Sequence, residues 1–166
     1  ELQEYVTPVP AQKINGDNWY QGSADAIYQN EYLIKRSNAE WTIILSGDHI
    51  YRMDYASILK THQALNADAT IACMKVPIEL ANQFGIVTAD AGQKITDFQE
   101  KPDTTEGCSD DKNFALASMG IYIFSTKLLI DILEKDSQDE NSSHDFGKDI
   151  LPSLIDNNKL FAHYFG

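Results

Sequence analysis

A single aspartate at the end of an apolar run is the residue of this sequence best suited to chemistry. Residues 41–45 are apolar apart from one threonine, and Ser46 and Gly47 separate them from Asp48. Ligands of open α/β sheets bind in the crevice beyond the carboxyl ends of the strands. A carboxylate there can hold a hard cation such as Mg²⁺ against substrate phosphates. Ser-Gly-Asp is also ordinary turn chemistry, so the tripeptide alone leaves a simple turn open.

Three further segments place polar groups where strands end or helices start. Gly22 precedes Ser23, a good N-cap residue, and free N–H groups at such a helix start favour an anion. Glu100 and Lys101 end a strand-like segment, and a lysine there suits a phosphate. Asp145 stands before another helical pattern. Each segment also has a purely structural interpretation. Ser23 and Asp145 would simply cap helices, and Lys101 would be a solvated surface lysine.

The hydrophobic pattern of the first half predicts a helix and then a βαβ unit. Residues 23–36 carry a partial apolar stripe, and the unbroken apolar run at 41–45 indicates a strand buried on both faces. Asp54 caps a helix with apolar residues at helical spacing. Residues 69–76 form a second buried strand, which Pro77 ends. Strand, helix and strand at this spacing make a right-handed βαβ unit.

The second half predicts a hairpin and a long alternating strand. The strands at 85–88 and 95–98 flank a turn. In the strand at 116–124, Tyr122 lies on the face opposite Met119. Two helices and a last strand follow, at 127–135, 146–157 and 160–164. The fold class is therefore α/β, with a mixed and mainly parallel sheet.

Composition narrows the class of partners. The 166 residues are enough for one domain, with 43% hydrophobic and 23% charged residues. The formal net charge of −12 argues against nucleic acid and anionic membranes as partners. It also means that a polyanionic substrate needs a local cation. Cys73 lies in an apolar run and Cys108 in a polar loop, so we expect reduced thiols and a cytoplasmic protein.

Several segments are more specific together than singly, because they occur in a fixed order. They are Gln12 and residues 19–26, 46–51, 98–102, 117–122 and 144–149. This set closely resembles bacterial glucose-1-phosphate adenylyltransferase, also called ADP-glucose pyrophosphorylase, which supplies ADP-glucose for glycogen synthesis. The resemblance runs from Gln12 to Tyr164. It implies a Rossmann-like nucleotide-diphospho-sugar transferase fold truncated at both ends, with residues 1–166 as part of the catalytic domain.

On the nucleotide side, the resemblance implies ATP as a substrate and Mg²⁺ as the cofactor. Gln12 is similar to the family's adenine-reading glutamine. Gly22 and Ser23 resemble its nucleotide-contacting turn, and Tyr20 would line the pocket. Asp48 resembles the aspartate that carries Mg²⁺, which would make it a catalytic residue.

On the sugar side, the resemblance implies glucose 1-phosphate as the second substrate. Glu100, Ser118 and Asp145 match residues that hold the glucose hydroxyls. Lys101 matches the lysine on the sugar phosphate and is the second expected catalytic residue. These roles agree with the chemistry, since carboxylates accept hydrogen bonds from hydroxyls and a lysine pairs with phosphate.

The resemblance also implies parts that lie outside this stretch. The family's glycine-rich loop with its catalytic arginine would precede Glu1. A second metal-holding aspartate, a left-handed β-helix domain and most activator-binding residues of this allosteric family would lie elsewhere. We therefore expect no turnover from residues 1–166 alone. The family implies a homotetramer for the whole protein, and an unpaired sheet edge would favour a dimer of this chain.

Three other interpretations stay open at this stage. The nearest is a different sugar-1-phosphate nucleotidyltransferase, using another nucleotide. A glycosyltransferase is more distant, because such enzymes usually carry Asp-x-Asp at the metal strand, whereas His49 and Ile50 follow Asp48 here. The non-enzyme interpretation is a non-catalytic regulatory homologue.

Overall fold

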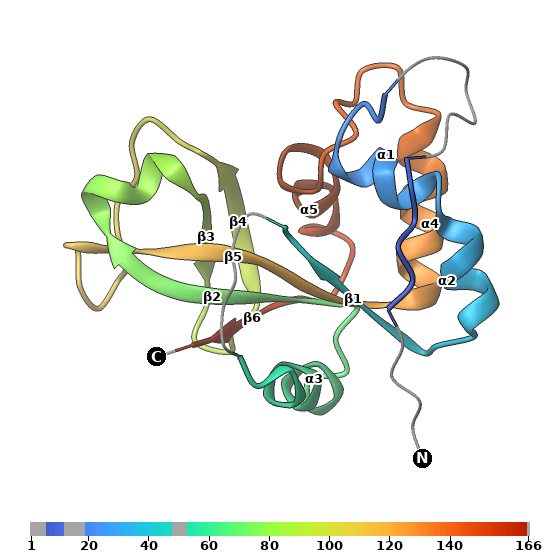
Figure 1. Cartoon of the computed structure of the whole chain (residues 1–166). Coiled ribbons are helices and arrows are strands. Elements are labelled where there is room, and N and C mark those ends of the chain that lie inside the picture. The colour runs from blue at the N-terminus through green and yellow to red at the C-terminus, as the bar shows by residue number, and fades with distance from the viewer. Residues whose placement is uncertain (1–5, 12–18, 48–52, 166) are drawn as a thin grey trace.

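A mixed β-sheet organises the computed structural model of this chain (Figure 1). The structure describes residues 6–11, 19–47 and 53–165. The elements in chain order are α1 (Ser23–Tyr28), α2 (Glu31–Ser37), β1 (Trp41–Leu45), α3 (Tyr55–Ala64), β2 (Ala69–Pro77), the 3₁₀ helix η1 (Ile78–Gln83), β3 (Gly85–Ala89), β4 (Ile95–Glu100), β5 (Phe114–Ser125), α4 (Thr126–Ser137), the π-helical turn η2 (Phe146–Ile150), α5 (Leu151–Leu154) and β6 (Leu160–Tyr164). The α/β class is confirmed.

The sheet is mixed, but its pairings are mostly antiparallel, so the expected mainly parallel sheet was wrong in that respect. Five strands lie in the order β4-β3-β5-β2-β6, and β1 also pairs with β5. The long strand β5 runs antiparallel to β1, β2 and β3, and among the described strands only β2 and β6 pair in parallel. β1 and β2 do run in the same direction, as a βαβ unit requires, but β5 lies between them and pairs with both.

Helices cover the two faces of the sheet unequally. In Figure 1, α1, α2, α4 and α5 gather on one side and α3 lies on the other. The larger core cluster joins Phe124 of β5 to Leu129 of α4 and Leu151 of α5. A smaller cluster joins Ile58 of α3 to Met119 and neighbouring residues of β5. The alternation expected along this strand is confirmed, because Tyr122 packs against the larger cluster and Met119 belongs to the smaller one.

The helix expected at 23–36 is two helices that break near Asn30. The Asn30 side-chain amide donates to the Ala26 carbonyl at 2.8 Å and to the Tyr20 hydroxyl at 3.1 Å. An asparagine that bonds its neighbouring backbone in this way competes with continued helix. Asp54 caps α3 through Ala56 N, as the sequence predicts. No helix in the described ranges is both long and apolar enough to cross a membrane.

β1 is an open edge of the sheet, and the expected burial on both of its faces was wrong. Thr126 N donates to Glu40 O, and Ser46 N donates to Gly120 O. The backbone N–H and C=O groups of even-numbered β1 residues therefore point toward β5. Those of odd-numbered residues point away from it, toward the open edge. Among the described residues, β1 pairs only with β5.

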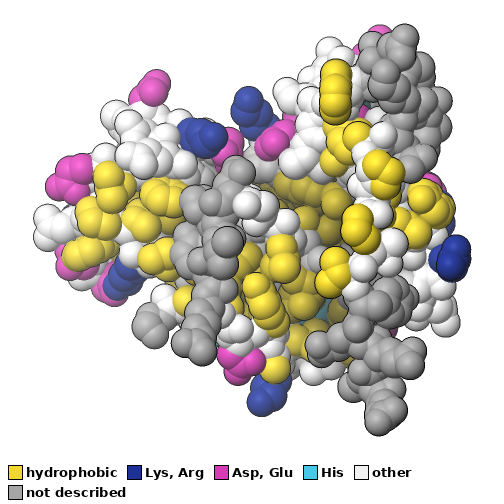
Figure 2. All heavy atoms as spheres, in the orientation of Figure 1, with side chains coloured by type: hydrophobic (Ala, Val, Ile, Leu, Met, Phe, Trp, Pro, Cys, Tyr) yellow, Lys and Arg dark blue, Asp and Glu magenta, His cyan; other side chains and the backbone are white. Residues whose placement is uncertain are grey.

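Apolar side chains accompany this open edge. Ile43 is 40% exposed and Leu45 is 52% exposed. Figure 2 shows hydrophobic side chains gathered on a hollowed face of the molecule in the same orientation. Another edge strand, β4, carries polar exposed residues such as Thr96 and Asp97. β1 has no charge, proline or bulge of the kind that normally protects an edge strand.

We expect Ile43→Lys to reduce self-association of this chain. An unprotected apolar edge offers unpaired N–H and C=O groups to a second strand, and a lysine there opposes pairing. Light scattering over a range of protein concentrations measures the effect, with Thr96→Lys as a charge-matched control on β4. A chain that is already monomeric at high concentration would contradict this expectation.

Candidate functional site

Three segments that are far apart in sequence meet at one end of the sheet. Ser23, at the start of α1, donates from Oγ to Asp145 Oδ2 at 3.1 Å and accepts from Phe146 N at 3.0 Å. Glu100, the last residue of β4, lies against Gly147, where an added Cβ would overlap with its carboxylate. The structure therefore brings together three of the expected site residues: Ser23, Glu100 and Asp145.

Asp145 is held at every polar atom. Its Oδ1 accepts from Gly147 N at 2.9 Å and from Lys148 N at 3.0 Å, which caps η2. Its N–H donates to Asp149 Oδ2, and its carbonyl accepts from the amides of Asp149 and Ile150. The capping role is confirmed. It does not exclude ligand binding, since an ionised carboxylate offers about four acceptor positions and these contacts with Ser23 occupy three.

Glu100 is a carboxylate in an unfavourable electrostatic position. Its side chain is only 23% exposed. Burial raises the pKa of Glu100 and the nearby Asp145 carboxylate raises it further, while Lys101 and Lys148 oppose the shift. Two carboxylates held close together in a partly buried site favour partners that donate hydrogen bonds.

Lys101 stands in a backbone conformation that lysine rarely adopts. Its φ is +47°, in the left-handed region, and Pro102 follows it. A residue before proline normally prefers extended backbone. Lys101 N donates to the Phe84 carbonyl at 3.0 Å, which ties the strained residue to the start of β3. The side chain is 63% exposed and its Nζ lies 4.0 Å from Glu100 Oε1, so the ammonium group is available to a ligand.

Ser118 lies in the middle of β5, and the structure adds Tyr122 beside it. Burial raises the pKa of Tyr122 to about 12, so it remains a neutral phenol. The Ser118 side chain acts to lower the pKa of Tyr122, while the charges of Glu100 and Asp145 act to raise it. The Tyr122 ring stacks on Phe146 with centroids 5.8 Å apart. Sequence reasoning placed Tyr122 only on a strand face, although it lies four residues after Ser118.

Gly22, expected on the nucleotide side, is a glycine for a different structural reason from the one predicted. The α1 amides expected to be free for an anion are not free, because Ala24 N and Asp25 N donate to the His144 carbonyl at 2.8 and 3.3 Å. An added Cβ at Gly22 would overlap with that same carbonyl. The glycine thus lets two backbone segments pack closely. The Tyr20 hydroxyl accepts from Asn30, as described above.

Gln12 and Asp48 lie outside the described residues. The last residues before Asp48 that can be placed lead toward the site, since Ser46 N donates to the Gly120 carbonyl at 2.8 Å. Gly120 has φ +69°, and an added Cβ would lie 2.8 Å from Ser46 Cβ. This glycine allows β1 to approach β5 two residues after Ser118. Within the described ranges, no group of three or more His, Cys, Asp or Glu side chains could hold a metal ion.

Comparison with known proteins agrees with this arrangement. A family model described as "Nucleotidyl transferase" matches residues 2–166. The chain is also 50% identical over 165 residues to "Glucose-1-phosphate adenylyltransferase 2" of Vibrio vulnificus (strain CMCP6). That match covers 99% of this chain and 41% of the relative, so the chain spans about two fifths of the relative's length. Because the family match extends over every segment of the site, the chain belongs to the nucleotidyl transferase family.

Proposed function

We propose that this chain carries the sugar-phosphate site of a glucose-1-phosphate adenylyltransferase. The whole protein would convert ATP and glucose 1-phosphate into ADP-glucose and pyrophosphate for glycogen synthesis. The main support is the convergence of two carboxylates and a strained lysine, Glu100, Asp145 and Lys101, at one end of the sheet. The name of the relative from Vibrio vulnificus supports the same reaction.

The geometry suits recognition of a phosphorylated sugar. Glu100 and Asp145 are acceptors held close together, so the hydroxyl groups of a glucose ring would give each the hydrogen-bond donors that the site favours. Ser118 and Tyr122 add hydroxyl groups from β5. Lys101 would pair with the phosphate and orient its oxygen for in-line attack on the α-phosphorus of ATP. No side chain needs to become covalently attached, because positioning and electrostatics supply most of the acceleration.

We assign Asp48 as the residue that would hold Mg²⁺. In the part of the chain that the structure describes, no group of three or more His, Cys, Asp or Glu side chains could hold a metal ion, so the assignment rests on the carboxylate of Asp48 itself. A single carboxylate is compatible with Mg²⁺, which is commonly bound through one or two carboxylates and completes its shell with water and substrate phosphate oxygens. When bound, the ion would neutralise negative charge between the phosphates.

The remaining assignments of the proposal concern ATP and the state of the whole protein. Gln12 would read the adenine, and the turn of Tyr20, Gly22 and Ser23 would border the nucleotide. The hydrogen bond from Ser23 to Asp145 supports a shared boundary between the two substrates. We further propose an allosteric, cytoplasmic homotetramer. Two cysteines that are both free agree with a reducing compartment.

The first test of this proposal is Lys101→Ala in the protein expressed with its natural ends. A charge-assisted contact contributes roughly 1.5–3 kcal/mol, so the KM for glucose 1-phosphate should rise about ten- to a hundredfold. The KM for ATP should change little. Steady-state kinetics with each substrate varied separately measures both. Equal losses for the two substrates would show that Lys101 does not bind the sugar phosphate.

A second substitution, Asp48→Ala, tests the metal assignment. We expect kcat to fall on the order of a hundredfold, as when a charge-stabilising group is removed from a transition state. Asp48→Glu keeps the charge but moves it by about one C–C bond and should not restore the rate. Pyrophosphate release measured over a range of Mg²⁺ concentrations gives the result. Normal turnover in Asp48→Ala would reduce Asp48 to a turn residue.

We expect Glu100, a proposed binding residue, to lower the stability of the folded state at neutral pH. Because its folded pKa is raised, ionising Glu100 disfavours the folded state at pH values above the ordinary carboxyl range. Glu100→Gln should therefore raise the melting temperature at pH 7, by less than about 4 °C for roughly 1 kcal/mol. The gain should shrink as the pH falls and vanish below about pH 4, where glutamate is protonated in both states.

Calorimetry from pH 4 to pH 8 measures this dependence, with Glu79→Gln, at an exposed position of η1, as the matched control. A Glu100→Gln protein that is less stable than the parent at pH 7 would contradict the electrostatic account of this site.

A further inference from the structure

The turn that leads into Asp145 contains a strained histidine with a partly buried acidic partner. His144 has φ +55°, in the left-handed region that a residue with a Cβ seldom adopts. Its Nδ1 lies 2.8 Å from Asp136 Oδ2, and the two side chains are only 13% and 11% exposed. A carboxylate only accepts hydrogen bonds, so Nδ1 carries the proton. Strained backbone of this kind persists only where the surroundings hold it in place.

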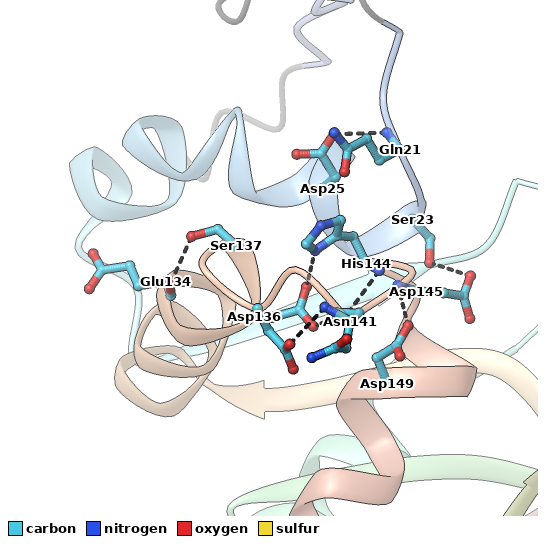
Figure 3. A network of polar contacts seen from close by, with 12 residues as sticks. Gln21, Ser23, Asp25, Glu134, Asp136, Ser137, Asn141, His144, Asp145 and Asp149 are labelled. Carbon is cyan, nitrogen blue, oxygen red and sulfur yellow. Dashed lines mark hydrogen bonds and ion pairs between the residues drawn. The ribbon is translucent and has the colours of Figure 1, made fainter.

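A closed set of hydrogen bonds surrounds this pair. Asp136 Oδ1 accepts from the Ser142 hydroxyl at 2.6 Å, and Ser142 Oγ accepts from His144 N at 2.9 Å. Figure 3 shows Asp136 reaching from α4 toward His144 while Asp145 points to Ser23 on the other side. Asp136 therefore fixes both the side chain and the amide of His144, the residue directly before Asp145.

The peptide group between His144 and Asp145 is fixed from the opposite side as well. The His144 carbonyl accepts from Ala24 N and Asp25 N, and Gly22 packs against it. Rotation of this peptide would break both hydrogen bonds at once. The direction in which the chain enters Asp145 thus depends on α4 through Asp136 and on α1 through these amides.

We propose that Asp136 and His144 form a positioning pair that aims the Asp145 carboxylate at glucose 1-phosphate. The inference rests on the proposed function of the site, because Asp145 is the group that would touch the sugar. Asp136 and His144 act through Asp145 and do not contact the reacting atoms. The capping bonds of Asp145 to η2 do not involve the pair, so its loss should misaim the carboxylate without unfolding the turn.

The test compares two substitutions of His144 in the protein expressed with its natural ends. His144→Ala removes the donor to Asp136 and should raise the KM for glucose 1-phosphate about tenfold, since small misplacements of a binding group are costly. The KM for ATP should stay within about twofold. His144→Asn should restore the sugar-phosphate KM, because asparagine tolerates the left-handed region and its side-chain N–H can reach Asp136.

Asp136→Ala provides a second, independent variant. Acting through the same contact, it should raise the same KM, and the double variant with His144→Ala should be no worse than the more affected single variant. Glu134→Ala is the matched control on α4, because its carboxylate pairs with Lys35 away from the turn. Asp145→Asn is the reference for losing the aimed group itself.

The outcomes separate this inference from the function beneath it. An unchanged glucose 1-phosphate KM in His144→Ala and Asp136→Ala, with Asp145→Asn impaired, would overturn the positioning pair alone. A fall in melting temperature and kcat with both KM values unchanged would reduce the pair to a structural role and also overturn it. An unchanged KM in Asp145→Asn would overturn the proposed sugar site itself.

Discussion

The carboxylate of Asp145 is the interaction on which the arrangement of the site depends. One of its oxygens caps η2, and the other accepts from Ser23 at the start of α1. Without it, the N-terminal amides of η2 would lose their acceptor and α1 would lose its side-chain link to this turn. Burial raises the pKa of Glu100, and the same group stands close enough to raise it further. The Asp145 side chain therefore both stabilises the fold and supplies a proposed binding group.

Close backbone approach is the second constraint, and glycines at two positions allow it. Gly22 lets α1 pack on the His144 carbonyl, and Gly120, with its left-handed backbone, lets Ser46 reach β5. The strained residues Lys101 and His144 stand beside or within the candidate site. Strain of this kind gathers where the surrounding structure fixes a functional group. In a chain of net charge −12, holding carboxylates together also requires nearby cations, and Lys101 and Lys148 supply them.

Local features of the fold could be predicted from the sequence because their causes are local. The Asp54 cap, the β3–β4 hairpin and the alternation along β5 follow from side chains only a few residues apart. Strand order could not be predicted in this way. An apolar run such as β1 has the same pattern whether its second edge is paired or open, so its burial was predicted wrongly.

The candidate site shows the same difference between local features, which could be predicted, and contacts between distant segments, which could not. Glu100, Lys101 and Asp145 could be proposed because each ends or begins an element and has a chemically apt side chain. Their shared location and the role of His144 depend on contacts between segments that no short pattern reveals. Tyr122 had a weak signal, its spacing of four residues from Ser118, but its proximity to Glu100 and Asp145 arises only when β5 lies beside β3 and η2. Gln12 still rests on the resemblance alone, and Asp48 rests on the resemblance and on its place after an apolar run.

A crystal structure with glucose 1-phosphate bound would test the central claim most directly. The account predicts glucose hydroxyls within hydrogen-bond distance, about 2.5–3.0 Å, of the Glu100 and Asp145 carboxylates. It also predicts the phosphate beside Lys101 Nζ. A ligand bound elsewhere, or one whose phosphate lies away from Lys101 while its hydroxyls miss both carboxylates, would contradict the assignment of this end of the sheet as the sugar-phosphate site.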